Sequence, residues 1–129
     1  MKGFIDNIEK LTTDNTDYRR VLYTGKHLQL VLMTLQPGEE IGSEVHRTHD
    51  QFLRVEAGRG EVVIDGAKHP LQDDDAVIVP AGARHNVVNT GDAPLQLYTL
   101  YGPPEHRDGV VQATKADEFD EHFDGKTTE

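Results

Sequence analysis

The stretch that decides the fold is GEEIGSEVHRTHDQFLRVEAG, residues 38–58. It opens and closes on a glycine, and within it QFLRVE has the alternation of a β-strand. Gln51, Leu53 and Val55 share one face of that strand, and we expect this face to point into a core. A second stretch, DDAVIVPAGARHNVVN at residues 74–89, has two short apolar runs on either side of a proline–glycine turn.

The rest of the chain also consists of short strand patterns separated by turns. The segment HLQLVLMTL alternates so that Leu28, Leu30 and Leu32 share one face. Further along, EVVID runs into Asp65-Gly66, the strongest short hairpin signal in the sequence. Roughly eight or nine such strands, with turns about every ten residues, predict an all-β antiparallel barrel or sandwich.

The length of the chain fits a single domain over residues 1–129, with the barrel core at about residues 20–102. Residues 1–17 are polar and form a short lead-in with room for one helical turn. Residues 114–124 indicate a short C-terminal tail that is either helical or irregular. Only 36% of the residues are hydrophobic, which suits a thin barrel or one that hides apolar surface in a dimer.

The composition excludes several classes of function. The net charge of −10 at pH 7 repels phosphate backbones and anionic lipids, so we expect neither nucleic acid nor a membrane as a partner. Cysteine is absent, which excludes disulfides, thiolate catalysis and sulfur ligands from cysteine. The N-terminal MKGFIDNIEK has no apolar run of the kind found in secretion signals, and the expected location is the cytoplasm.

Four polar side chains are placed to meet inside the barrel. At strand spacing, Glu44 and His46 point to the same face. Gln51 shares its face with core residues, and His85 follows a proline–glycine turn and begins another strand. Two imidazoles, one carboxylate and one amide oxygen suit a single divalent ion, with Fe(II), Mn(II), Ni(II) and Zn(II) all open.

The two stretches resemble the motifs of the cupin family. The first family motif is a glycine, five residues, His-x-His, three or four residues, a glutamate, six residues and a glycine. Its spacing is kept here by Gly38, Glu44, His46, Gln51 and Gly58. The second motif is a glycine, five residues, Pro-x-Gly, two residues, a histidine, three residues and an asparagine. Its spacing is kept by Asp74, Pro80, Gly82, His85 and Asn89. The resemblance implies a double-stranded β-helix, the jelly-roll barrel of the cupins.

The departures from the family pattern concern the ligands. The first histidine of the motif is Glu44 in this chain, and the motif glutamate is Gln51, so the site keeps one carboxylate in a new position. The resemblance therefore implies one divalent metal ion held by Glu44, His46, Gln51 and His85. The alternative is that metal binding has been lost and that Gln51 only forms a hydrogen bond with His46.

The stretch YGPPEH, residues 101–106, also resembles small single-domain cupins described as mannose-6-phosphate isomerase-like, a likeness of fold rather than evidence for that activity. A metal in the barrel would polarise a small oxygen-containing ligand. We therefore expect a divalent-metal-dependent enzyme of the dioxygenase, isomerase or lyase type, with His49 or Glu44 as general base. The alternative is a non-catalytic module that binds a metal or a small molecule.

Two apolar side chains point to the outer face of their strands by the same alternation, Met33 and Phe52. Exposed apolar groups on a sheet face favour a subunit interface. The sequence therefore predicts a homodimer.

Overall fold

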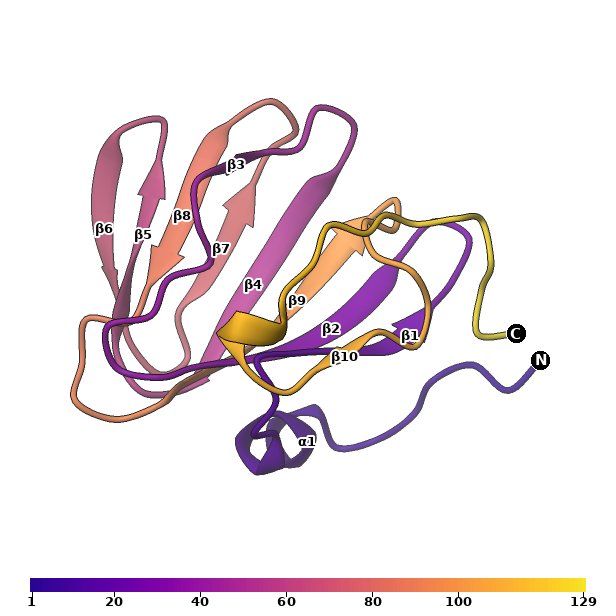
Figure 1. Ribbon diagram of the computed structural model, residues 1–129, viewed down its shortest axis with the longest axis horizontal. Helices are drawn as coiled ribbons and strands as arrows, with labels where there is room; N and C mark the ends of the chain where they lie inside the picture. Colours follow the sequence, from indigo (N-terminus) through magenta and orange to yellow (C-terminus); the bar gives the residue numbers. More distant parts are fainter.

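Ten strands form two antiparallel sheets in the computed structural model, which describes residues 1–129 (Figure 1). The larger sheet consists, in order of neighbours, of β10 (Val111–Gln112), β1 (Arg19–Thr24), β2 (Gln29–Leu35), β9 (Leu95–Gly102), β4 (Asp50–Ala57) and β7 (Ala76–Val79). The smaller sheet consists of β3 (Glu44–Val45), β8 (Arg84–Val88), β5 (Gly60–Ile64) and β6 (Ala67–Leu71). From β6 to β9, successive strands alternate between the sheets. This is the jelly-roll arrangement, which confirms the predicted fold class.

The core lies between the two sheets and is built from the inner faces of both. In β4 the alternation is as predicted, because Gln51, Leu53 and Val55 are buried and the residues between them are partly exposed. The apolar side chains of this strand join a cluster that also contains Val31, Leu35, Val62, Leu71, Val79, Val87, Leu95 and Leu97. The cluster holds the two sheets together by removing its apolar surface from water.

Strand β2 is buried on both faces, and the prediction for Met33 was wrong for that reason. Met33 lies in the core with no exposed surface instead of on the outer face. Leu30 and Leu32 lie on the outer face and are still buried. Helix α1 (Ile8–Asp14) packs against β2, β4 and β9, and its Leu11 lines the same surface hollow as Leu32. Leu28 precedes the strand and is 54% exposed. A strand covered on both sides is apolar throughout, so alternation does not identify its inner face.

Two turns explain why the strands end where they do. Asp65 and Gly66 have φ angles of 47° and 84°, which close β5 and β6 into the predicted hairpin. Gly58 follows β4 with a φ of 92°, and a Cβ there would lie 2.4 Å from the carbonyl oxygen of Pro94. Only glycine fits this position. Asp74, where the family motif has a glycine, keeps the turn with a φ of 71°.

The ends of the chain lie side by side and cover parts of the barrel (Figure 1). The N-terminal lead-in contains the seven-residue helix α1, longer than the single turn expected, capped by the Asn7 side chain. The C-terminal segment after β9 is irregular apart from β10 and the 3₁₀ turn η1 (Lys115–Asp117). The backbone amide of Lys2 donates to the Glu129 carboxylate over 2.8 Å, which ties the two termini together. No helix of the protein is both long enough and apolar enough to span a membrane.

Candidate metal centre

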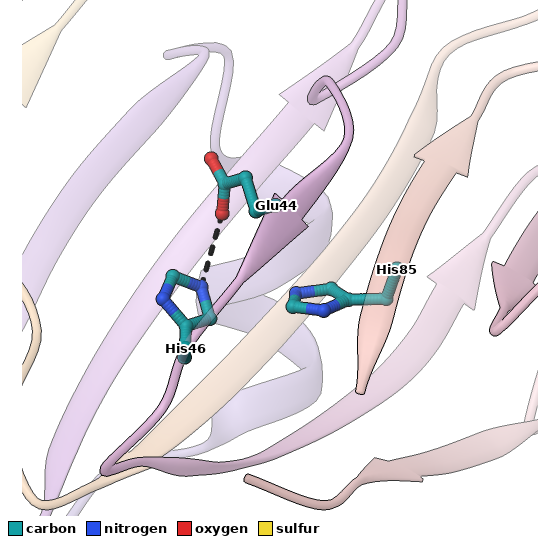
Figure 2. Close-up of side chains that lie close together, drawn as sticks. All are labelled: Glu44, His46 and His85. Carbon is teal, nitrogen blue, oxygen red and sulfur yellow. Dashed lines mark ion pairs between the residues drawn. The ribbon is translucent and has the colours of Figure 1, made fainter. Parts of the chain in front are cut away.

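Three of the four predicted ligands come together at one end of the barrel interior, as Figure 2 shows. Glu44, His46 and His85 each offer one potential ligand atom, and these three atoms lie within 4.8 Å of one another. The closest pair is His46 Nε2 and Glu44 Oε2, at 3.0 Å. The two imidazole rings have centroids 5.1 Å apart. A carboxylate and two imidazoles at such distances can share one divalent ion.

The pairing of two strands places these side chains together. Glu44 in β3 lies directly opposite His85 in β8, so both side chains leave the sheet on the same face. His46 follows β3 by one residue and points inward beside them (Figure 2). Along β8 and the residue after it the alternation is as predicted, because His85, Val87 and Asn89 are all buried.

In both histidines Nδ1 is turned towards an acceptor outside the cluster. His85 Nδ1 lies 3.0 Å from the carbonyl oxygen of Ala83, which can only accept, so the proton belongs on Nδ1. His46 Nδ1 faces Glu105 Oε2 at 3.7 Å, and His46 Nε2 faces the candidate ligand Glu44. In metal-binding histidines an acceptor likewise fixes one ring nitrogen, and the other nitrogen faces the ion.

Gln51 differs from Gln29, another buried glutamine of the barrel, in the use of its amide oxygen. Gln29 donates to Thr24 and to the carbonyl of His106, and its oxygen accepts from two backbone amides. Gln51 donates to Thr99 Oγ1 over 3.0 Å, but its oxygen is buried and has no partner. An unpaired buried acceptor costs about 1–3 kcal/mol. A bound cation would remove that cost, and therefore the free oxygen of Gln51 fits a metal site.

The electrostatics around the three residues favour a positive charge at their centre. Burial raises the pKa of Glu44, but the hydrogen bond and charge of His46 and the charge of Arg19 outweigh it and hold the pKa below its ordinary value. Burial lowers the pKa of His46, but Glu44 and Glu105 outweigh it and raise the pKa above its ordinary value. The carboxylate stays ionised and stabilises a cation, whether that is the imidazolium or a metal ion.

A second carboxylate, which the sequence analysis did not identify, lies beside the predicted general base His49. Glu105 Oε2 is 2.9 Å from His49 Nε2, and His49 Nδ1 is 2.8 Å from the carbonyl oxygen of Pro103. The same carboxylate faces His46, as described above, and His122 at 3.5 Å. Glu105 belongs to the YGPPEH stretch, but that segment is irregular beyond β9, so strand parity gave no indication of where this side chain points.

A cavity of about 320 Å³ opens over the site and is covered by the C-terminal segment. From the barrel it is lined by Arg19 and Glu44. From the C-terminal segment it is lined by Glu105, His106, Glu118, Phe119, Asp120, Glu121 and His122. The cavity is large enough for a small metabolite and has polar groups on nearly every side.

Comparison with known proteins gives three informative similarities. The family whose sequence model matches the chain is described as Cupin domain, and the match covers residues 31–101. The protein YrkC of Bacillus subtilis is 50% identical over 122 residues, which cover 90% of this chain and 66% of that protein. The crystal structure of BH2720 from Bacillus halodurans is 48% identical with a TM-score of 0.88, and the match covers 90% of this chain and 92% of that one.

A more distant similarity concerns an enzyme of sugar-phosphate metabolism. The mannose-1-phosphate guanylyltransferase of Escherichia coli is 33% identical over 73 residues, which cover 57% of this chain and 15% of that enzyme. The sequence analysis noted a likeness to cupins described as mannose-6-phosphate isomerase-like. This enzyme is a second kind of protein named for a mannose phosphate that the chain resembles. Because 85% of the enzyme lies outside the matched region, its activity is not transferred to this chain.

Proposed function

The chain belongs to the cupin domain family, and we propose that it is a divalent-metal-dependent enzyme acting on a small oxygen-containing metabolite. One observation carries the proposal. Glu44, His46 and His85 converge, Glu44 lines a polar cavity, and the buried Oε1 of Gln51 has no hydrogen-bond partner. A structural cluster of buried polar groups would satisfy its own members. The predicted fourth ligand atom, Gln51 Oε1, is instead left free to bind an ion.

In this proposal Glu44, His46, Gln51 and His85 hold one ion, with Fe, Mn, Zn and Ni as candidates. When bound, the ion supplies Lewis-acid polarisation of a substrate oxygen, or dioxygen chemistry if it is iron. The residues around it define the site. Ala83 and Thr99 hold His85 and Gln51 in place through the hydrogen bonds described above.

We propose the pair His49 and Glu105 as the general base of the reaction. Glu44, the other candidate from the sequence, has its carboxylate directed at His46 and is assigned to the metal. His49 and Glu105 stand 2.9 Å apart, and each has only a small exposed fraction. In this pair Glu105 orients the imidazole of His49 and would stabilise the imidazolium that forms when a proton is taken up. The reaction class remains dioxygenase, isomerase or lyase.

The alternative function is a non-catalytic module that binds a metal or a small molecule. The observation in its favour is the C-terminal segment, which covers the cavity and places Glu118 next to Arg19. A storage or sensing module does not need substrate and product to pass through this cavity repeatedly. Conversion of any small oxygen-containing compound by the metal-loaded protein would decide in favour of the enzyme.

The oligomeric state and the location of the protein are also proposals. Phe52 lies on the outer face of β4 with its ring 6.2 Å from that of Tyr98, and the neighbouring Ile78 is 69% exposed. This apolar face supports a homodimer formed through the larger sheet. We also propose that the protein is cytoplasmic. Light scattering coupled to size exclusion, which gives the mass directly, would test the dimer.

The metal proposal is tested by elemental analysis of untagged protein after dialysis against each candidate ion. We expect close to one ion per chain in the native protein and none in His85→Ala. His69→Ala is the matched control, because His69 is exposed on β6 and outside the cluster. Full occupancy in His85→Ala, or no uptake by the native protein, would overturn the ligand assignment.

A further inference from the structure

Arg19 is a buried charge inside the barrel that uses little of its hydrogen-bonding capacity. It begins β1 on the inner face, opposite Met33, and only 3% of the residue is exposed. Nη1 donates to Gln112 over 2.8 Å and to Glu118 Oε2 over 3.1 Å, whereas Nε is buried without a partner. A guanidinium can bind a carboxylate with two parallel hydrogen bonds, and here Glu118 receives only one.

The carboxylate of Glu118 lies in a ready-made set of donors. Besides Arg19, it accepts from Tyr18 Oη over 3.0 Å and from Lys115 Nζ over 2.9 Å. Burial raises the pKa of Glu118, but the hydrogen bonds from Lys115 and Tyr18 and the charge of Arg19 outweigh it and lower the pKa. Tyr18, Arg19 and Lys115 thus form a carboxylate-binding group that faces the interior.

This group reaches, through Arg19, the cavity that Glu44 of the candidate metal centre also lines. Arg19 and Glu118 line that cavity together with Glu44 of the metal cluster. The other carboxylates around it have imidazole partners of their own, since Glu121 pairs with His106 and Glu105 with His49. If Glu118 withdraws, Arg19 and Lys115 are left without any carboxylate partner.

Glu118 is also on a part of the chain that can withdraw. It follows η1 in an irregular stretch, and its neighbours from Ala116 to Asp120 are all exposed. Phe119, directly after it, is 49% exposed and adds little to the core. Segments with so few buried contacts open at a low cost in free energy.

We propose that Tyr18, Arg19 and Lys115 are the subsite for a substrate carboxylate, and that Glu118 occupies it until the substrate displaces it. The inference rests on the proposed function and narrows it to small carboxylic acids with a second oxygen donor, such as hydroxy acids, oxo acids and dicarboxylates. The carboxylate takes the place of Glu118 on Tyr18, Arg19 and Lys115, and the second oxygen points to the metal centre. Glu118 acts as an internal competitor that keeps the buried arginine paired in the free protein.

The test is the affinity of malonate for the Mn(II)-loaded protein, measured by titration calorimetry, with malonamide as its uncharged counterpart. We expect Glu118→Gln to bind malonate at least tenfold more tightly than the native protein, with no gain for malonamide. Asp120→Asn is the matched control, because Asp120 lines the same cavity and is 92% exposed. It removes the same charge without freeing Arg19. The double variant Arg19→Met/Glu118→Gln leaves no stranded carboxylate and should lose the gain.

The outcomes separate the subsite from the metal centre, because metal uptake is measured independently and the titration is repeated on metal-free protein. Equal malonate affinity in the native protein and Glu118→Gln, an equal gain in Asp120→Asn, or no binding in any variant would overturn the subsite. Absence of metal uptake with the Glu118→Gln gain retained would overturn the metal proposal and support the subsite.

Discussion

Strand β9 carries Leu95 and Leu97 into one end of the barrel interior and Thr99 and Tyr101 into the other. Its two neighbours in the larger sheet divide in the same way. The inner face of β4 runs from Val55 and Leu53 to Gln51, and that of β2 runs from Leu35 and Met33 to Gln29. The same strands therefore build an apolar end and a polar end, and the candidate metal centre lies at the polar end.

The difference between the ends shows how this small barrel combines stability with a site. The apolar end buries side chains with no polar atom, and each contributes about 1.5–3 kcal/mol of transfer free energy. The polar end contains a buried acceptor without a partner, Gln51 Oε1. Such an atom costs about 1–3 kcal/mol until a ligand satisfies it. Stability comes from one end and binding capacity from the other.

Removing a side chain from the apolar end should have the largest effect on the stability of the protein. Leu97→Ala removes a side chain that is 1% exposed in the core, and we expect it to lower the free energy of unfolding by about 2–5 kcal/mol. Urea unfolding measures this loss, and metal content per folded chain should not change. Leu28→Ala, the same change at a position that is 54% exposed, should stay within about 0.5 kcal/mol of the native protein. Equal losses in both variants would contradict the division of the two ends.

Adding a charge at the polar end should change the free energies by a smaller amount. It should strengthen metal binding and weaken the stability of the metal-free protein. We expect Gln51→Glu to tighten metal binding about tenfold, equivalent to about 1.4 kcal/mol, because a carboxylate replaces a neutral oxygen ligand. The metal-free variant should be less stable than the native protein, since it buries an extra charge. Competition with a fluorescent chelator measures the affinity.

Gln29→Glu is the matched control for this prediction. Gln29 is a fully buried glutamine at the same end, and both sides of its amide are already hydrogen-bonded. Its replacement should reduce stability with no gain in metal affinity. Unchanged affinity in Gln51→Glu would mean that the Gln51 oxygen does not touch the ion.

Acid should loosen the C-terminal segment that covers the polar end. Of the changes considered, this one should alter the free energy least. Burial raises the pKa of Glu121, but the hydrogen bonds from His106 and from the Arg107 amide outweigh it and lower the pKa, as happens at Glu118. A lowered pKa in the folded state stabilises the closed segment above the ordinary value of 4.5, and this stabilisation is lost as the pH falls through the lowered value. The NMR shift of the Arg107 amide should therefore titrate with a midpoint below 4.5. A midpoint at or above 4.5, or simultaneous changes in β9, would contradict a local opening.

Much of this arrangement could be predicted from local patterns. The alternation of QFLRVE identified the inner face of β4, and Asp65-Gly66 identified the hairpin of β5 and β6. The motif spacing indicated that Glu44, His46 and His85 belong together, and the structure brings them together. These inferences succeed because strand parity is a local property, fixed by the geometry of the backbone over a few residues.

Other features had no local signal. Met33 was assigned to the wrong face because α1 covers the far side of β2, and nothing within β2 reports that cover. Glu105 lies in an irregular segment, where side-chain direction follows from packing instead of periodicity. Arg19 and Glu118 are 99 positions apart, so neither could be recognised as the partner of the other.

The sequence by itself determined the jelly roll, the family and three residues that converge on one site. Repeating short-range rules decide all of these, since alternation, turn chemistry and motif spacing act within a few positions. Only the tertiary structure decided that His49 meets Glu105, that the Gln51 oxygen is free, and that the C-terminal segment places Glu118 over the cavity on Arg19. These contacts join segments far apart in the chain, and their geometry exists only once the two sheets have packed and the tail has closed over them.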